Sequence, residues 1–143
     1  MATIISHSPE ETESLGETWG HAAQRGWVFA LTGELGAGKT QLVKGLARGL
    51  GIAARVHSPT FTLVNEYGGG RLRLLHLDLY RLETREQILS AGLDELLPPD
   101  GVAVIEWAER IYDLRFTIYD LKRARIEIVN VVERKITYDD FGA

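Results

Sequence analysis

The chain has 143 residues, of which 45% are apolar, a size and composition that predict one globular domain over residues 1–143 with its own core. Its formal net charge of -4 gives no broad cationic field, so we expect any nucleic acid to be held by a partner. The absence of cysteine excludes disulfides, thiolate metal sites and cysteine nucleophiles.

The first residues, MATIISHSPEETE, lack the basic stretch followed by an apolar stretch that is typical of a secretory signal. No apolar run in the chain approaches the length of a membrane span. We therefore expect a soluble cytoplasmic protein.

Residues 8–26 predict an amphipathic helix. Ser8 is placed as its N-cap, Pro9 stands at the first helical position, and Glu11 follows the cap by three residues. Gly26 is well placed to end the helix. Apolar residues recur between these limits at helical spacing, namely Leu15, Trp19, Ala22 and Ala23.

Strand-like and helical patterns then alternate. Residues 27–32, WVFALT, are nearly all apolar, which is typical of a strand buried on both faces of a parallel sheet. Residues 40–50 carry apolar positions at helical spacing and are followed by Gly51 as a stop. Two strand-like runs, 61–67 and 72–78, are separated by three glycines and predict a hairpin.

The second half of the chain continues this alternation. Residues 84–97 predict a helix that two prolines close, and residues 101–107, GVAVIEW, predict another buried strand. Residues 125–132 and 135–138 predict a second hairpin, while residues 108–124 favour no single assignment. This order predicts an α/β fold with a mixed, mainly parallel central sheet flanked by helices.

The segment 33–40 reads GELGAGKT and matches the phosphate-loop pattern G-x-x-x-x-G-K-[ST]. Glycines let successive N–H groups point at phosphate oxygens, and the following helix adds its positive N-terminal end. Lys39 is expected to reach the terminal phosphates, and the Thr40 hydroxyl to bind a magnesium ion that bridges them. The alternative is a flexible glycine turn, but the flanking strand and helix favour the phosphate cradle of a P-loop NTPase domain.

An acid inside this loop, Glu34, is unfavourable for an anion site by charge. Its side chain is therefore expected to point away, because the backbone of such a loop makes the phosphate contacts. The loop residues expected to bind nucleotide are Gly33, Glu34, Leu35, Gly36, Ala37, Gly38, Lys39, Thr40 and Gln41.

A phosphate loop also needs a carboxylate that holds metal or orders the attacking water, normally at the end of a neighbouring strand. Asp78 ends the run LRLLHLD, and Glu106 ends the run VAVIE. Either acid by itself can be a solvated strand end. Beside a phosphate loop, both become candidate catalytic residues together with Lys39, and candidate metal ligands together with Thr40. The sequence leaves open which acid ligates the metal directly.

The segment 57–67, HSPTFTLVNEY, gathers the hydroxyls of Ser58, Thr60 and Thr62 just ahead of a strand. Pro59 restricts the residue before it to an extended conformation. Loops that sense a terminal phosphate often have this composition, although such hydroxyls more often cap ordinary turns.

Four further side chains admit two interpretations each. His76 has no second histidine or cysteine at ligand spacing, which favours a hydrogen-bonded structural histidine over a metal ligand. Trp107 lies on the opposite strand face from Glu106 and belongs either to the core or to a stacking contact with a base or a partner. Arg81 and Arg110 are candidates for stabilising transition-state charge, but arginines near acids are commonly plain surface pairs.

Taken together, GELGAGKT, SPTFTLVNEY, HLDLYRL and VIEW in this order resemble the TsaE family, also called YjeE. These are small bacterial ATPases needed to make threonylcarbamoyladenosine in tRNA, and the resemblance runs from about Ser8 to Trp107. It implies a compact P-loop fold that binds ATP and magnesium and has weak intrinsic hydrolysis. It also implies docking on the TsaD and TsaB pair, where ATP turnover resets the complex and the partners bind the tRNA and perform the transfer chemistry.

The motif match also implies residue roles. Thr40 and Glu106 would coordinate magnesium, with Asp78 close by as a second acid, so the resemblance favours Glu106 as the direct ligand. The other nucleotide contacts that it implies are the N-terminal stretch around Glu11, the nucleotide-sensing segment 58–62 with Thr60 and Thr62, and Trp107.

Three other classes of protein are alternatives. A small P-loop kinase usually carries an arginine-bearing lid over its acceptor, and no Arg-rich insertion is visible in the sequence. A guanine-nucleotide switch would need an N-K-x-D segment, which the chain lacks, and a D-x-x-G at its second acid, which neither Asp78 nor Glu106 begins. A module that holds ATP without turnover agrees with the sequence as well as an ATPase does.

Overall fold

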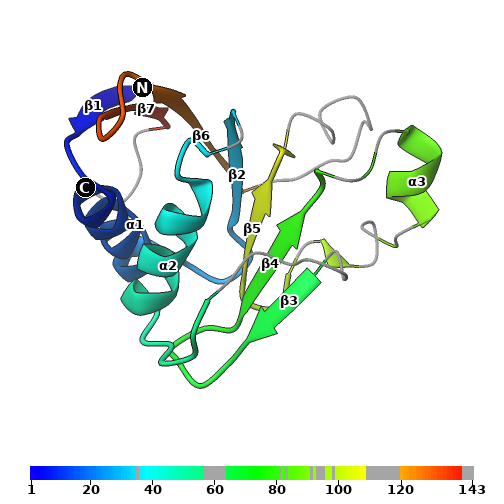
Figure 1. Ribbon diagram of the computed structural model, residues 1–143. Coiled ribbons are helices and arrows are strands. Elements are labelled where there is room, and N and C mark those ends of the chain that lie inside the picture. The colour runs from blue at the N-terminus through cyan, green and yellow to red at the C-terminus, as the bar shows by residue number, and fades with distance from the viewer. Residues whose placement is uncertain are drawn as a thin grey trace.

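A computed structural model of the chain describes residues 1–34, 36–56, 64–80, 82, 84–90, 92, 96–97, 99–108 and 120–139. The described elements are, in chain order, β1 (Ala2–Ser6), α1 (Pro9–Ala22), β2 (Val28–Gly33), α2 (Lys39–Gly49), β3 (Val64–Tyr67), β4 (Leu74–Asp78), α3 (Arg85–Ser90), β5 (Val102–Glu106), β6 (Leu121–Ile128) and β7 (Arg134–Tyr138). They build a mixed α/β fold around one sheet, with α1 and α2 side by side (Figure 1).

The seven described strands lie in the order β1-β7-β6-β2-β5-β4-β3. The four central strands β6, β2, β5 and β4 are parallel, whereas the outer pairs are antiparallel. The central strands therefore end at the same edge of the sheet, and β2 delivers the phosphate loop to that edge. The predicted fold class, a mixed and mainly parallel sheet flanked by helices, is confirmed.

Both faces of β2 are buried, as the apolar run 27–32 predicts, and so are those of β5. Phe29 and Leu31 of β2 join the core cluster that includes Trp19 of α1 and Leu42 and Leu46 of α2. The alternate residues, Val28 and Ala30, join a second cluster on the other face of the sheet. A strand clamped in this way holds the loop at its end in a fixed position.

The first helix begins as predicted and ends earlier. The Ser8 side chain accepts a hydrogen bond from the Glu11 backbone N–H at 3.1 Å, and Pro9 opens the helix. The helix stops at Ala22, because Ala23 takes an extended conformation. Gly26, predicted to end the helix, instead occupies the following turn into β2 with φ of 92°.

Both predicted hairpins are present, with different bounds. β3 pairs with β4, and β6 pairs with β7. β6 begins at Leu121 rather than residue 125, because parallel pairing with β2 extends it at its start. Residues 61–63 of the predicted first hairpin and 109–119 of the unassigned stretch lie outside the described residues.

Two elements differ more. The first strand, β1, was not predicted, and among the described strands it lies at the edge of the sheet and pairs with β7. Within the predicted helix 84–97 the structure has α3, a short helix that ends at Ser90, and one further helical residue at Leu96, while residues 91 and 93–95 lie outside the described residues. None of the helices in the described ranges is long and apolar enough to cross a membrane.

Candidate functional site

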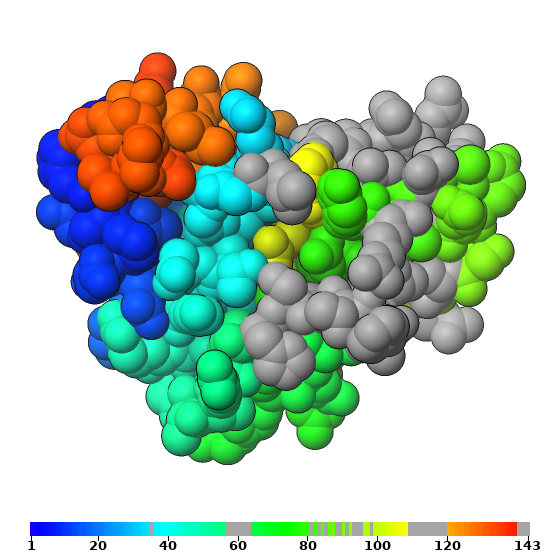
Figure 2. All heavy atoms as spheres, viewed as in Figure 1, coloured from blue at the N-terminus to red at the C-terminus, as the bar shows by residue number. Residues whose placement is uncertain are grey.

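A pocket of about 470 Å³ opens where the phosphate loop enters α2, beside the ends of β4 and β5. Its wall is completed by the first turn of α1 and by the β6–β7 hairpin. Figure 2 shows this face, on which the phosphate loop and α2 (cyan) adjoin the ends of β5 (yellow) and β4 (green). Five segments that are distant in the sequence therefore meet at one cavity.

The phosphate loop owes its shape to glycine backbone conformations. Gly33, Gly36 and Gly38 all have positive φ, with values of 148°, 80° and 104°. At Gly33 a Cβ would also approach the Ile126 carbonyl oxygen to 2.5 Å, so strand pairing requires glycine there as well. Gly38 is the N-cap of α2 and brings no side chain to the helix end. The helix therefore begins directly at the pocket wall, as an anion-binding loop requires.

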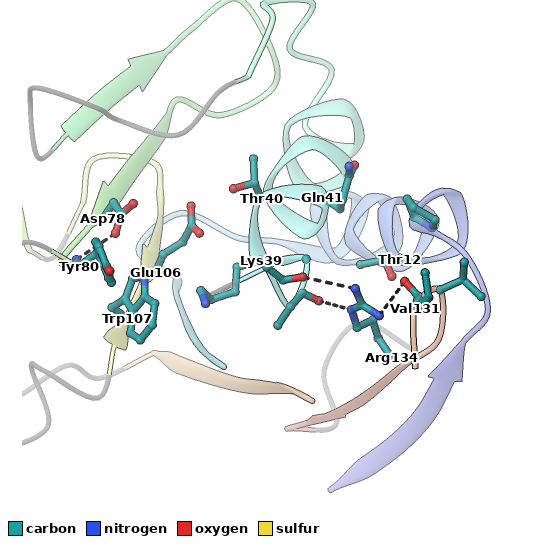
Figure 3. A pocket seen from close by; sticks show the side chains of 15 residues that line it. Thr12, Lys39, Thr40, Gln41, Asp78, Tyr80, Glu106, Trp107, Val131 and Arg134 are labelled. Carbon is teal, nitrogen blue, oxygen red and sulfur yellow. Dashed lines mark hydrogen bonds between the residues drawn. The ribbon is translucent and has the colours of Figure 1, made fainter. Parts of the chain in front are cut away.

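Lys39 is held inside this loop. Its Nζ donates to the Gly33 carbonyl at 2.6 Å and to the Glu34 carbonyl at 3.0 Å, and it lies 4.2 Å from the centroid of the Trp107 ring. The side chain points toward the acids rather than to solvent (Figure 3). Glu34 itself is exposed and does not line the pocket. The loop thus brings a fixed positive charge to the end of the pocket where the carboxylates lie.

Asp78 and Glu106 stand side by side at the ends of adjacent parallel strands, where they are register partners. Glu106 is only 4% exposed, whereas Asp78 is partly buried and its carboxylate accepts the Tyr80 N–H at 3.0 Å. Burial raises the pKa of Asp78, and the charge of Glu106 adds to that rise while the Tyr80 hydrogen bond opposes it. The carboxylates of Asp78 and Glu106 are therefore neighbours that lie in different environments.

His76 is completely buried and forms a hydrogen bond through Nε2 to Oε2 of Glu106. The expectation of a hydrogen-bonded histidine is confirmed, although the partner is a candidate site residue. Within the part of the chain that the structure describes, Nδ1 has no hydrogen-bond partner. No short motif indicates this contact, because it depends on the pairing of β4 with β5.

Trp107 closes the acidic end of the pocket. It is the one described residue other than glycine with positive φ, at 60°. Its ring stacks at a tilt on that of Tyr80, with 5.0 Å between centroids, and Tyr80 is 46% exposed. A strained backbone at the end of a buried strand places this ring beside Lys39, where it also packs against the second core cluster.

Arg134, at the start of β7, lines the opposite end of the pocket. Its guanidinium donates to the carbonyls of Ala37 at 2.9 Å and Gly36 at 3.3 Å, and to the hairpin carbonyls of Asn130 at 2.7 Å and Glu133 at 2.9 Å. Figure 3 shows the side chain reaching from the hairpin to the loop. Sequence reasoning missed this residue, because an isolated arginine at a strand start carries no motif.

The comparisons with known proteins agree with this geometry. Residues 6–136 match the family model of the threonylcarbamoyl adenosine biosynthesis protein TsaE. The chain belongs to the TsaE family. The TsaE of Bacillus subtilis is 42% identical over 139 residues, which cover 94% of this chain and 83% of the relative. That of Nostoc sp. is 48% identical over 117 residues, covering 78% of this chain and 70% of the relative.

A solved structure gives the same result for the fold. The crystal structure of Bacillus subtilis YdiB superposes on this chain with a TM-score of 0.77 and 35% sequence identity, covering 96% of this chain and 83% of that one. The resemblance to TsaE drawn from four sequence motifs is thereby confirmed.

This TsaE chain gathers some of the predicted site residues and leaves others apart. Those that line the pocket are Gly36, Ala37, Gly38, Lys39, Thr40, Gln41, Asp78, Glu106 and Trp107. Glu11 does not line it, because its carboxylate turns back to accept the His7 N–H at 2.7 Å, whereas its neighbours Pro9 and Thr12 do. Leu35, Ser58, Thr60, Thr62, Arg81 and Arg110 lie outside the described residues.

The side-chain oxygens of the pocket are suited to a magnesium ion that is also held by a nucleotide, rather than to a metal ion held by protein ligands alone. The described ranges contain no group of three or more His, Cys, Asp or Glu side chains that could hold a metal ion. Magnesium at phosphate sites takes one or two carboxylates and fills its other positions with phosphate oxygens and water. Asp78 and Glu106 beside Thr40 fit that pattern in the TsaE pocket.

Proposed function

We propose that this chain is a P-loop ATPase that serves the synthesis of threonylcarbamoyladenosine in tRNA, working in the cytoplasm as a single domain over residues 1–143. One observation carries the proposal. Lys39, Asp78 and Glu106 meet in one pocket at a phosphate loop, in a chain whose relatives are named for this biosynthesis.

The proposed roles follow the positions of the side chains. The loop 33–41 binds the phosphates of ATP through backbone N–H groups, with Lys39 at the terminal phosphate. Thr40 and Glu106 hold magnesium, which neutralises phosphate charge when bound. Trp107 lies beside Lys39 and stacks against the nucleotide. Glu11, Thr60 and Thr62 are proposed as further nucleotide contacts on the motif match alone.

Asp78 is proposed to orient the attacking water and accept its proton. An aspartate with a raised pKa holds a proton more readily than an ordinary one, which suits a general base. Its partial exposure lets water reach it, whereas Glu106 is almost completely buried. The two neighbouring acids can therefore divide the work between proton transfer and metal binding.

Partners are proposed to complete the cycle. The TsaD and TsaB pair would receive this subunit, and ATP hydrolysis would reset that pair between rounds of threonylcarbamoyl transfer. A net charge of -4 favours tRNA contact through those partners rather than directly. Weak hydrolysis by the subunit alone and faster hydrolysis in the complex are the expected pattern.

The test is ATP hydrolysis measured with and without a TsaD and TsaB pair from the same organism. The wild type is expected to be stimulated by the pair, and Lys39→Ala to bind no ATP and show no stimulated rate. Lys44→Ala is the matched control, since it removes a lysine from the same helix outside this pocket. A wild type that the pair leaves unstimulated contradicts the pathway role, and stoichiometric phosphate transfer to a small acceptor would indicate a kinase instead.

A further inference from the structure

The buried pair of His76 and Glu106 is not explained by the fold alone. His76 is 0% exposed and Glu106 is 4% exposed, so the imidazole and the carboxylate both lie out of solvent. A buried polar pair in a sheet is destabilising unless its hydrogen bonds are satisfied, and an apolar pair of similar volume would pack there at lower cost. The position therefore calls for a role beyond packing.

Strand register explains how the two side chains meet. Asp78 is the partner of Glu106 across β4 and β5, and His76 is the partner of Val104 two residues earlier. These four residues share one face of the two strands, because side chains alternate. Glu106 therefore extends diagonally back to His76, whereas Asp78 remains at the strand end near Tyr80.

The hydrogen bonds of the imidazole indicate which nitrogen carries the proton. Nε2 contacts the Glu106 carboxylate, and Nδ1 has no partner among the described residues. A proton on Nε2 gives the carboxylate a donor and leaves only a lone pair unmatched at Nδ1. A proton on Nδ1 would bury an unsatisfied N–H and set a lone pair against the carboxylate, which is the less favourable arrangement.

We propose that His76 is a positioning residue that holds Oε2 of Glu106 through its Nε2–H, which fixes the carboxylate rotamer and leaves the other oxygen for the metal of a bound nucleotide. This inference rests on the proposed magnesium and ATP site. Partners that orient a ligating side chain typically change metal affinity or activity about 10–100-fold when removed.

A first experiment tests the contact without any nucleotide. Nitrogen NMR of the imidazole in the wild-type protein should show His76 protonated at Nε2 and bare at Nδ1. Glu106→Gln should shift the Nε2 resonance, whereas the exposed His21 should not respond. The proposal is overturned if the proton lies on Nδ1, or if the Nε2 resonance of His76 does not change in Glu106→Gln.

A second experiment separates positioning from structure. His76→Leu removes the donor at similar volume, and His76→Gln restores an N–H near the Nε2 position. We expect His76→Leu to reduce the gain in ATP affinity on adding magnesium, measured by calorimetry, by about 10–100-fold. The affinity for ATP without magnesium should stay within about threefold. His76→Gln should recover most of the magnesium effect, and kcat should follow the same order.

A double variant supplies the matched control. In a Glu106→Gln background, His76→Leu should change the magnesium effect little further, because the oxygen that it positions has already lost its charge. Equal losses in His76→Gln and His76→Leu, or a full magnesium effect in a folded His76→Leu, overturn the proposal. A wild type without ATP turnover contradicts the proposed function, and the resonances and the magnesium-dependent affinity still decide the role of His76.

Discussion

Asp78 and Glu106 carry the same chemical group at the ends of adjacent strands, yet their neighbours differ. Glu106 is buried and bonded to the imidazole of His76, whereas Asp78 is partly exposed and bonded to the Tyr80 N–H. Environments of this kind assign different roles to paired carboxylates. Because the pKa of Asp78 is raised, the contribution of this one residue to the stability of the protein should depend on pH and can be measured.

Asp78→Asn should stabilise the protein at neutral pH. Burial raises the pKa of Asp78 above its value in the unfolded chain, so the ionised carboxylate opposes folding above the folded-state pKa. This destabilisation decreases as the pH falls through the pKa of Asp78 in the folded protein. It is absent below the pKa of Asp78 in the unfolded chain. The gain in Tm from Asp78→Asn should therefore be largest near neutral pH and shrink in acid. Thermal unfolding of both proteins between about pH 7 and pH 4 measures it.

Asp120→Asn is the control for that measurement, because Asp120 is exposed and lies in the turn before β6. Its effect on Tm should vary little over the same pH range. A gain from Asp78→Asn that grows as the pH falls would contradict the raised pKa.

At the scale of single residues, the sequence predicts those site residues whose positions a local motif specifies. GELGAGKT identifies Lys39 and Thr40 because the spacing of the loop itself dictates their positions. The partner of His76 follows from the register of β4 and β5, and the contacts of Arg134 follow from where a hairpin folds over the loop. Neither arrangement is encoded in a short stretch of residues.

At the scale of elements, α1 and α2 approach each other at glycines. A Cβ on Gly45 would lie 1.9 Å from the Glu13 carbonyl oxygen, and one on Gly16 would lie 2.3 Å from that of Leu42. Because the neighbour is backbone in each case, the helices would have to move apart. This packing fixes α2, and hence the start of the helix at the phosphate loop, against α1.

Gly45→Ala is therefore expected to destabilise the protein by about 1–3 kcal/mol despite the higher helix propensity of alanine. Urea unfolding measures the loss. Gly68→Ala is the matched control, because nothing lies within 4 Å of a Cβ there, and it should change stability by less than about 0.5 kcal/mol. Equal stabilities of the two variants would contradict the close helix contact.

Arg134 ties the β6–β7 hairpin to the phosphate loop. Arg134→Met keeps the stem of the side chain and removes the charged donors to Gly36 and Ala37, so the loop should lose its fixed shape. Hydrogen bonds of charged groups contribute about 1.5–3 kcal/mol, so ATP affinity should fall about tenfold or more. Calorimetry measures it. Arg125→Met, which removes an exposed arginine of β6, should leave affinity within about twofold.

The predicted strands were confirmed where burial on both faces produced a nearly continuous apolar run, as in β2 and β5. β1 was not predicted, because it has only five residues and its burial alternates, so it lacks the long apolar run that marks β2 and β5. The early end of α1 escaped notice because Ala22 and Ala23 continue the helical spacing, while the backbone leaves the helix at Ala23. Tertiary pairing, rather than local propensity, sets those limits.

On the scale of the whole molecule, the pocket is lined by parts that lie far apart in the sequence. The phosphate loop, the ends of β4 and β5, the start of α1 and the β6–β7 hairpin all face it. A nucleotide bound there would contact several of these parts at once, and it would bind the folded chain only. Binding should therefore appear as added stability of the entire domain.

Magnesium ATP at about 100 times its dissociation constant should raise the free energy of unfolding by about 2.7 kcal/mol. For a chain of this size, Tm should rise by about 2–4 °C for each kcal/mol. Lys39→Ala should abolish the rise, because the loop would lose its contact with the terminal phosphate, while Lys44→Ala should keep it. A rise of equal size in Lys39→Ala would mean that ATP binds elsewhere. A wild-type rise of equal size without magnesium would remove the reason to assign Glu106 to the metal, because the phosphate loop by itself would then account for the binding energy.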